Sequence, residues 1–358
     1  MIRRSALLAT TLVLLVTVSA GFLASGDAGT SPKREIAFVR GIDRLEIWVV
    51  DVASTRQRRL TRNSLGDDSP EWSPHGARIA FVRDAYGMGE IYVMNANGTK
   101  KRRLTRNRAF DAVPIWSPDG RRIAFRSDRD GQTAIYTMSA DGKDETKLTR
   151  SSAPQGAPAW SPDGSRIAFV AYKQPLGTGG PTEIRVVDVD GTDERRLTHA
   201  GTQDLEPAWS PDGRQIVFTR GFLRFSRSDQ RYDLVRSEIW RVGADGRNAR
   251  RLTRTRKEIE DFFPAWSPDG RRISFVSDRG GHRDIYVIDR NGRALRRLTR
   301  APGEDRWPTW APHGQRIAFI SDRAGNDEIF VMKTDGSNQR RLTRSPRADD
   351  QPVWRPVR

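Results

Sequence analysis

The sequence predicts an all-β fold, a seven-bladed β-propeller of four-stranded antiparallel blades. The main observation is a repeat in which a Pro-x-Trp run is followed by an Ile-Ala-Phe run, an Ile-Tyr-Val run and an Arg-Arg-Leu-Thr run. Four short strands separated by turns are the pattern of a propeller blade. The tryptophans that mark the repeats are Trp72, Trp116, Trp160, Trp209, Trp266, Trp310 and Trp354.

The second observation is the phase of the repeat. Residues 35–62 contain the second, third and fourth runs without a Pro-x-Trp run before them, and a single Pro-x-Trp run ends the chain at Trp354. We therefore expect residues 352–358 to complete the blade of residues 35–62 and to close the ring, which leaves no unpaired half-blade. The other blades are expected to start near residues 70, 114, 158, 207, 264 and 308.

The third observation is the chemistry of the turns. Ser-Pro-Asp-Gly follows most of the tryptophans, as at 210–213, and Asn-Gly or Asp-Gly follows the third run, as at 97–98 and 141–142. Proline fixes φ and glycine tolerates a positive φ, so these sequences favour tight turns and hairpins. Little of the chain is left for helices.

The N-terminal 28 residues predict a signal peptide, followed by a propeller over residues 31–358. Arg3 and Arg4 precede an uncharged run from Ser5 to Gly26, which ends in small residues. The run is also long enough for an uncleaved membrane anchor. In both cases the propeller is expected to be exported: periplasmic, extracellular or associated with the cell envelope. The chain has no cysteine, so disulfides and thiol catalysis are excluded.

The net charge of +17 comes partly from arginines in the fourth run of each repeat, as in 102–106 and 340–344. The fourth strand is the outer edge of a blade, where charge blocks association between edges. The alternative is adhesion to anionic envelope polymers or lipid head groups. Nucleic acid is not expected, because these arginines are spread around a ring and do not line one groove. We expect a monomer that meets a membrane only peripherally or through its anchor.

A ring of acidic residues stands three positions before the proline of each repeat. Aspartate there could bond to the backbone of its own turn. However, carboxylates that encircle the mouth of a central channel repel one another unless arginine or a cation neutralises them, and calcium prefers several oxygen ligands. The sequence therefore raises the hypothesis of a calcium site. The ring consists of Asp67, Asp111, Gln155, Asp204, Asp261, Asp305 and Asp349.

Two insertions, 172–182 and 221–237, are expected as loops between a second and a third strand. Such loops should open on the same side as the loops that lead into the first strands. Aromatic residues and arginine commonly anchor protein interfaces, although loop aromatics can also pack against one another. The candidate partner-binding residues are Phe222, Arg224, Phe225, Phe262, Phe263 and Trp307.

The repeated Pro-x-Trp-Ser-Pro-Asp-Gly-x-x-Ile-Ala-Phe, followed by Ser-Asp-Arg as at 127–129, 277–279 and 321–323, resembles the TolB-type propeller repeat. This resemblance covers the predicted propeller and implies an exported scaffold that binds a protein or cell-envelope partner. TolB carries an α/β domain before a six-bladed propeller. Here the repeats begin directly after the signal and number seven, so a role in the Tol-Pal system does not follow from the repeat alone.

The alternative function is an enzyme. Similar propellers cap the prolyl oligopeptidases, but the chain has no Gly-x-Ser-x-Gly motif for a hydrolase serine. Its four histidines, at 75, 199, 282 and 313, lack metal-ligand spacing. A carbohydrate-active or peptide-active enzyme would have to use carboxylates of the channel mouth. Because the repeated ring distinguishes no catalytic pair, we expect a binding scaffold and not an enzyme.

Overall fold

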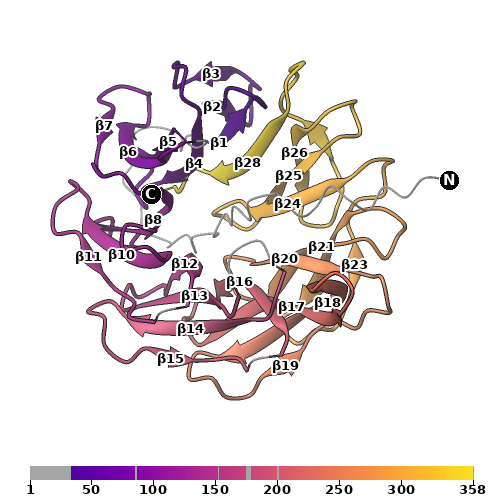
Figure 1. Cartoon of the computed structure of the whole chain (residues 1–358). Helices are drawn as coiled ribbons and strands as arrows, with labels where there is room; N and C mark the ends of the chain where they lie inside the picture. The colour runs from indigo at the N-terminus through magenta and orange to yellow at the C-terminus, as the bar shows by residue number, and fades with distance from the viewer. Residues whose placement is uncertain (1–33, 85–86, 152, 175–178, 200, 358) are drawn as a thin grey trace.

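The computed structural model describes residues 34–84, 87–151, 153–174, 179–199 and 201–357, and within them every regular element is a β-strand. The predicted signal segment, residues 1–28, lies outside the described residues. Figure 1 shows the sheets arranged around a central axis, with the N-terminal strands beside the C-terminal strand. The all-β prediction is confirmed.

The strands form units of four antiparallel strands in sequence order from the centre outward. The innermost strands are β4 (Asp67–Trp72), β8 (Asp111–Trp116), β12 (Gln155–Trp160), β16 (Gln203–Trp209), β20 (Asp261–Trp266), β24 (Asp305–Trp310) and β28 (Asp349–Trp354). The second strands are β5 (Arg78–Arg83), β9 (Arg122–Ser127), β13 (Arg166–Tyr172), β17 (Gln215–Ser226), β21 (Arg272–Ser277), β25 (Arg316–Ser321) and β1 (Glu35–Arg40).

The third strands are β6 (Glu90–Asn95), β10 (Ala134–Ser139), β14 (Thr182–Asp188), β18 (Arg231–Gly243), β22 (Asp284–Asp289), β26 (Glu328–Lys333) and β2 (Glu46–Asp51). The short outer strands are β7 (Arg102–Arg103), β11 (Thr146–Lys147), β15 (Arg195–Arg196), β19 (Arg250–Arg251), β23 (Arg296–Arg297), β27 (Arg340–Arg341) and β3 (Gln57–Arg59). One parallel pair, Thr182 with Gln203, joins the β12–β15 and β16–β19 units into one sheet. β28 pairs antiparallel with β1, so the two ends of the described chain share one sheet.

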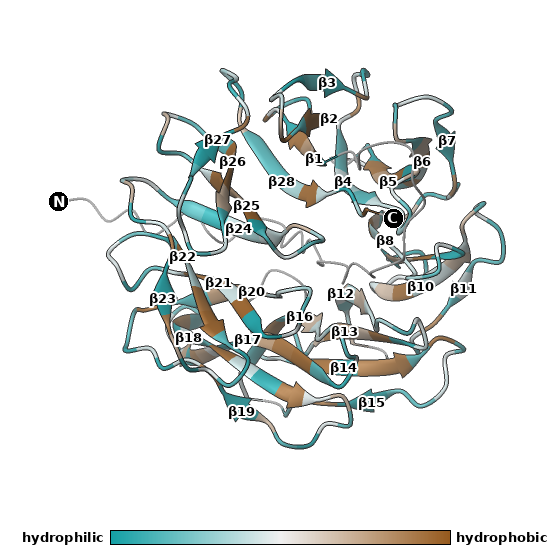
Figure 2. Ribbon diagram, turned by 180° about the vertical axis from the view of Figure 1, so that it is seen from behind, coloured by the Kyte–Doolittle hydropathy of each residue, from teal (hydrophilic) through white to brown (hydrophobic). Residues whose placement is uncertain are grey.

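The core lies between neighbouring units. The phenylalanine of the second strand is fully buried in each unit, and one apolar cluster combines Phe38 and Val50 with Ile320 and Val331 of the adjacent unit. Figure 2 shows hydrophobic residues along the second and third strands and hydrophilic residues on the outer fourth strands. Burial of these apolar faces between sheets is the main source of stability in such a fold.

The repeated tryptophans join successive innermost strands. Each indole nitrogen donates a hydrogen bond of 3.0 to 3.3 Å to a backbone carbonyl of the preceding innermost strand. The contact of Trp72 with the Val353 carbonyl links the start of the repeats to the end of the chain. The Pro-x-Trp run therefore sets the spacing of the units around the axis.

The Leu-Thr step fixes the third strand to the fourth. The threonine hydroxyl accepts a hydrogen bond of 2.9 to 3.1 Å from the backbone N–H at the isoleucine of the third strand, as between Thr61 and Ile47. This contact recurs in every unit and buries both groups. It explains the threonine that follows the leucine after each short outer strand.

Every innermost strand contains a bulge with a left-handed residue just before its proline. The φ angles of these residues lie between 52° and 60°, a region that residues other than glycine rarely adopt. The residues are Ser69, Val113, Ala157, Glu206, Phe263, Trp307 and Gln351. Backbone strain of this kind is held in place only by surrounding structure, and here it recurs at the end of each innermost strand where the chain enters the unit.

Candidate partner-binding face

The loops that lead into the innermost strands open on the same side as the loops between second and third strands. We call this side the mouth face. Most of the exposed large apolar residues in the described chain belong to it: Ile42 (72% exposed), Met88 (56%), Leu65 (50%), Phe225 (45%) and Leu234 (39%). Leu295, between β22 and β23, is the one on the opposite face. This asymmetry distinguishes the mouth face as a surface for association.

Three loops of the mouth face lie side by side at the first two units. The Asp67 N–H donates to the Leu45 carbonyl at 2.8 Å, and the Asp84 N–H donates to the Gly66 carbonyl at 2.9 Å. Leu65 therefore lies on the loop between those that carry Ile42 and Met88. The three side chains come from segments tied together by backbone hydrogen bonds.

The 221–237 insertion is a β-hairpin, which corrects the expectation of a loop. β17 and β18 stay paired as far as Ser226 with Arg231, with one register shift between Phe222 and Leu223. Phe225 contacts Tyr232 with ring centroids 5.0 Å apart, and the Arg236 guanidinium lies 4.0 Å from the centre of the Phe222 ring. The hairpin is thus an extension of the sheet beyond the other units.

The structure brings three of the predicted partner-binding residues together. Phe262 and Phe263 lie with ring centroids 5.1 Å apart, and Phe263 and Trp307 with centroids 5.3 Å apart, both edge to face. All three are half-buried, and Phe262 and Phe263 pack against the core between two units. Phe222, Arg224 and Phe225 instead lie on the β17–β18 hairpin, where Arg224 is 3.8 Å from Asp233. The six residues therefore form two groups.

The predicted acidic ring is buried, and each aspartate has an arginine partner. The nitrogen-to-oxygen distances are 2.5 to 3.0 Å, and all six aspartates are at most 1% exposed. The pairs are Arg83 with Asp67, Arg129 with Asp111, Arg220 with Asp204, Arg279 with Asp261, Arg323 with Asp305 and Arg40 with Asp349. Charge-assisted bonds of this kind satisfy buried carboxylates.

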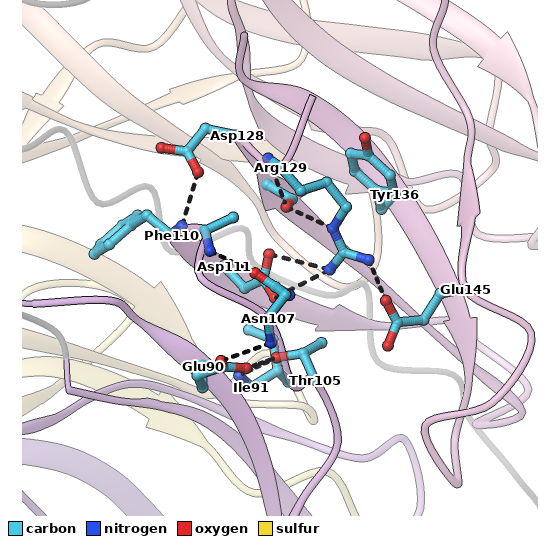
Figure 3. A network of polar contacts seen from close by, with 12 residues as sticks. Glu90, Ile91, Thr105, Asn107, Phe110, Asp111, Asp128, Arg129, Tyr136 and Glu145 are labelled. Carbon is cyan, nitrogen blue, oxygen red and sulfur yellow. Dashed lines mark hydrogen bonds and ion pairs between the residues drawn. The ribbon is translucent and has the colours of Figure 1, made fainter. Parts of the chain in front are cut away.

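Each of these arginines also covers the aromatic rings of its own sheet. The guanidinium carbons lie 4.5 to 5.7 Å from ring centres on the second and third strands. Figure 3 shows one example, in which Arg129 lies between Asp111, Tyr136 and Glu145. Asn107 donates a further hydrogen bond to Asp111 at 2.7 Å. The arginine is therefore held by an ion pair on one side and by an aromatic face on the other.

The β12–β15 unit lacks this arrangement. Gln155 takes the place of aspartate, Ala171 stands where Arg83 and Arg220 stand in their units, and Arg185 occupies the aromatic position opposite Phe169. The Gln155 side-chain oxygen accepts from the Thr149 hydroxyl, and its amide nitrogen has no partner among the described residues. In this unit the aspartate, its arginine partner and the aromatic residue are therefore all replaced.

Arginine was one of the two counterions considered for the acidic ring from the sequence, but the arginines that pair with it were not identified, although a signal existed. The arginine follows its aspartate by 16 residues at Arg83 and Arg220 and by 18 residues at Arg129, Arg279 and Arg323. The longer spacing corresponds to the Ser-Asp-Arg motif. Asp349 pairs instead with Arg40, 309 residues away.

Sequence reasoning also missed carboxylates one or two positions beyond the acidic ring. Burial raises the pKa of Glu206 to about 7 and that of Asp350 to about 6, and it raises the pKa of Asp68. Glu206 accepts from the Thr219 hydroxyl and from the Phe263 N–H, both at 2.6 Å. Asp68, Glu206 and Asp350 lie on innermost strands, beside or at the left-handed residues.

No group of three or more His, Asp or Glu side chains suited to a metal ion occurs in the part of the chain that the structure describes. The six aspartates are instead bonded to arginine. Within the same residues, no helix has the length and apolar composition needed to cross a bilayer.

The outer-strand arginines are partly used within the fold. In six units the second arginine of the Arg-Arg pair contacts a carboxylate of the third strand, as Arg341 does with Glu328 at 2.6 Å and Arg297 with Asp284 at 2.5 Å. The first arginine often reaches a backbone carbonyl of the next unit, as Arg296 does with Asp335 at 2.7 Å. These side chains therefore join strands and units, besides charging the edge.

The arginine after Leu-Thr behaves differently. It is exposed, and its side chain has no ion pair or hydrogen bond among the described residues. The arginines at this position are Arg62, Arg106, Arg150, Arg254, Arg300 and Arg344, and His199 takes the position in the remaining unit. They begin the loops that lead into the innermost strands and add positive charge to the mouth face.

Comparison with known proteins agrees with this architecture. The family model described as the TolB beta propeller domain matches residues 29–155, 150–259 and 247–357. The Tol-Pal system protein TolB of Thioalkalivibrio sulfidiphilus is 42% identical over 60 residues, which are 17% of this chain and 13% of that protein. The match to this curated relative is therefore local.

Solved structures of several functions share the fold. TolB from Acinetobacter baumannii superposes with a TM-score of 0.57 at 21% identity over 90% of this chain and 82% of that chain. A Mycobacterium tuberculosis puromycin-hydrolyzing peptidase gives 0.66 at 18% identity, over 92% of this chain and 54% of that one. Oligogalacturonate lyase from Vibrio parahaemolyticus gives 0.63 at 16% identity, over 90% and 87%. At these identities the likeness concerns the fold alone.

Proposed function

Because this chain belongs to the TolB β-propeller domain family, we propose that it is an exported, non-catalytic scaffold whose mouth face binds a protein or cell-envelope partner. The observation that carries the proposal is the distribution of exposed apolar residues, five of which belong to the mouth face and one to the opposite face in the described chain. Exposed apolar residues together with exposed arginines on one face are typical of a recognition surface.

The proposal includes a closed ring of seven blades. It is supported by the seven four-strand units of the described chain, by the pairing of β28 with β1, and by the tryptophan bonds that run through every innermost strand. A closed ring holds the loops of the mouth face in fixed relative positions. Preorganised loops bind with a smaller loss of conformational entropy.

Export is part of the same proposal. Its supports are the charged and then apolar N-terminal sequence and the similarity to a protein of the Tol-Pal system. A periplasmic or envelope location would place the mouth face among envelope proteins and polymers. Mass spectrometry of the mature N-terminus from the native host checks both the location and the cleavage expected near residue 28.

An enzyme is the second candidate, because relatives of this fold include a peptidase and a lyase. The observation that favours it is the pair of carboxylates with raised pKa, Glu206 and Asp350, since catalytic acids are often tuned in this way. Incubation with oligogalacturonate and with peptide substrates tests it. Turnover that is lost in Glu206→Gln or Asp350→Asn would replace the scaffold proposal.

The scaffold proposal is tested by capture from an envelope extract of the native host. We compare the unmodified protein with a Leu65→Ser, Met88→Ser, Phe225→Ser variant of the mouth face and with a Leu295→Ser control on the opposite face. Leu65, Met88 and Leu295 are exposed, so each of their changes should alter the free energy of unfolding by no more than about 0.5 kcal/mol. Phe225→Ser also removes a ring contact with Tyr232, so it should cost about 1 kcal/mol.

A partner retained by the unmodified protein and by Leu295→Ser, and lost by the triple variant, is the expected result. Equal retention by all three proteins would remove the mouth face as the binding surface. The Phe263→Ala and Trp307→Ala changes serve a different purpose: because these rings pack on each other, they should lower the thermal midpoint as well.

A further inference from the structure

A groove of about 540 Å³ lies at the seam where the first and last described strands meet. We call it the seam groove. Arg34, Val52 and Ala53 contribute from the start of the repeats, and Arg316, Lys333, Asn338, Gln339 and Arg340 are among the residues contributed from the β24–β27 unit. It lies at the turns between third and fourth strands, on the side opposite the mouth face. Its size is within the range of small-molecule sites.

The charge of the seam groove is uniform. Four cationic side chains line it, and no carboxylate is among its described lining residues. Arg340 donates to the Val52 carbonyl, and the Gln339 amide donates to the Leu298 and Gly336 carbonyls. The side chains of Arg34, Arg316 and Lys333 have no hydrogen bond or ion pair within the described chain. Three of the cations are therefore free to meet a ligand.

The nearest acid of the same turn is already engaged. One oxygen of Asp335 accepts from the Ser337 N–H at 2.9 Å and from the Ser337 hydroxyl at 2.6 Å, which lowers the pKa of Asp335, with a smaller contribution from Lys333. Asp335 caps its own turn and does not line the groove. Its one negative charge offsets at most one of the four cations that line the groove.

A groove at the corresponding turn of the β12–β15 unit is lined by residues of that unit alone. That groove has a volume of about 520 Å³ and is lined by Arg166 and Arg195 together with Asp188, Asp190 and Asp193. By position in the repeat, Asp188 corresponds to Lys333 and Asp193 to Asn338, while both arginines are kept. We call it the acidic counterpart. The two grooves thus differ in the sign of their formal charge.

Arg316 also departs from most of its equivalents. The guanidinium carbons of Arg78, Arg166 and Arg272 lie 4.7 to 5.2 Å from the ring centre of the next tryptophan. Arg316, like Arg122, has no such ring contact among the described residues. Its guanidinium is left for another partner.

We infer that the seam groove binds a ligand carrying phosphate groups. Guanidinium groups match the geometry of phosphate oxygens in pairs, and an ammonium and an amide add further donors. The seam groove supplies all three groups, from Arg34, Arg316, Lys333 and Asn338. This site is separate from the mouth face and does not depend on the proposed scaffold function. A soluble phosphate compound or a lipid phosphate headgroup could supply the same chemistry.

Calorimetric titration with inorganic triphosphate tests the inference. We compare the unmodified protein, Lys333→Asp in the seam groove, and Lys257→Asp, an exposed lysine of the mouth face that gives the same change of net charge. The expected result is one site per chain, weakened at least tenfold by Lys333→Asp and unchanged by Lys257→Asp. Equal weakening by both variants would show attraction to the net charge alone and overturn the inference.

A gain-of-function variant and a second probe complete the test. Asp188→Lys with Asp193→Asn gives the acidic counterpart the lysine and asparagine of the seam groove at the corresponding positions, and it should raise the number of bound triphosphates from one to two. Sedimentation with phosphatidylglycerol vesicles separates the sources: loss of vesicle binding in Lys333→Asp indicates a lipid headgroup, and triphosphate binding alone indicates a soluble ligand. No binding of either probe would overturn the inference.

Discussion

The β12–β15 unit and the other six units have the same strand order and the same tryptophan bond. They differ in the side chains that are buried where the innermost strand begins. Six units place an aspartate, an arginine and an aromatic ring together, as Asp204, Arg220 and Trp240 are placed. The β12–β15 unit has Gln155, Ala171 and Arg185 at those positions. The three side chains change together, which indicates that they stabilise the fold as a set and that the backbone does not require them.

The largest expected effect comes from breaking one such set. Arg220→Ala leaves Asp204 buried without its partner, which should lower the free energy of unfolding by about 3 to 5 kcal/mol. The double change Asp204→Gln, Arg220→Ala copies the β12–β15 unit and should cost less than Arg220→Ala alone. Urea denaturation followed by tryptophan fluorescence measures both.

A control for this comparison is Gln155→Leu. It removes a buried amide whose nitrogen has no partner in the described chain, so its cost should stay below about 1 kcal/mol. If the double variant were as unstable as Arg220→Ala, the stabilisation would come from the contacts of Arg220 with aromatic rings and not from its ion pair with Asp204.

A smaller effect on stability is expected from the pH dependence of Glu206, which differs from Asp204 on the same strand. On β16, Asp204 is paired with arginine, whereas Glu206 is buried against Thr219 and Phe263 and its pKa is raised to about 7. Glu206 therefore keeps its proton in the folded protein and loses it in the unfolded chain near pH 4.5. Its favourable contribution is present below pH 4.5 and is lost as the pH rises through 7.

Glu206→Gln should therefore match the unmodified protein near pH 4.5 and become more stable than it by up to about 3 kcal/mol at pH 8. Denaturation midpoints across this range measure the difference. Glu258→Gln, an exposed residue of the mouth face, is the matched control and should show no pH-dependent difference. Parallel curves for Glu206→Gln and the unmodified protein would mean that Glu206 is ionised in the fold.

The smallest expected effect concerns calcium. Because arginine balances the six aspartates of the acidic ring, millimolar calcium should leave the thermal midpoint unchanged. Magnesium at the same concentration controls for ionic strength. A calcium-specific rise of the midpoint would restore the hypothesis of a cation at the channel mouth and would require the arginines to move.

Much of the architecture could be predicted because it repeats locally. Alternating apolar runs, Ser-Pro-Asp-Gly turns and the Pro-x-Trp anchor each act within a few residues, so their period indicates strands and blades directly. The 221–237 hairpin was the exception: a glycine and several arginines interrupt its alternation, and only pairing between β17 and β18 shows that it continues the sheet.

The sequence by itself determined the repeat, the strand order and the residues of the acidic ring. Only the tertiary structure decided what those residues contact: it joined Asp349 to Arg40, buried Glu206 without a cation, and gathered the cations of the seam groove from opposite ends of the chain. The physical reason is that strands form from local periodicity, whereas charge partners and groove linings depend on register and on which units become neighbours.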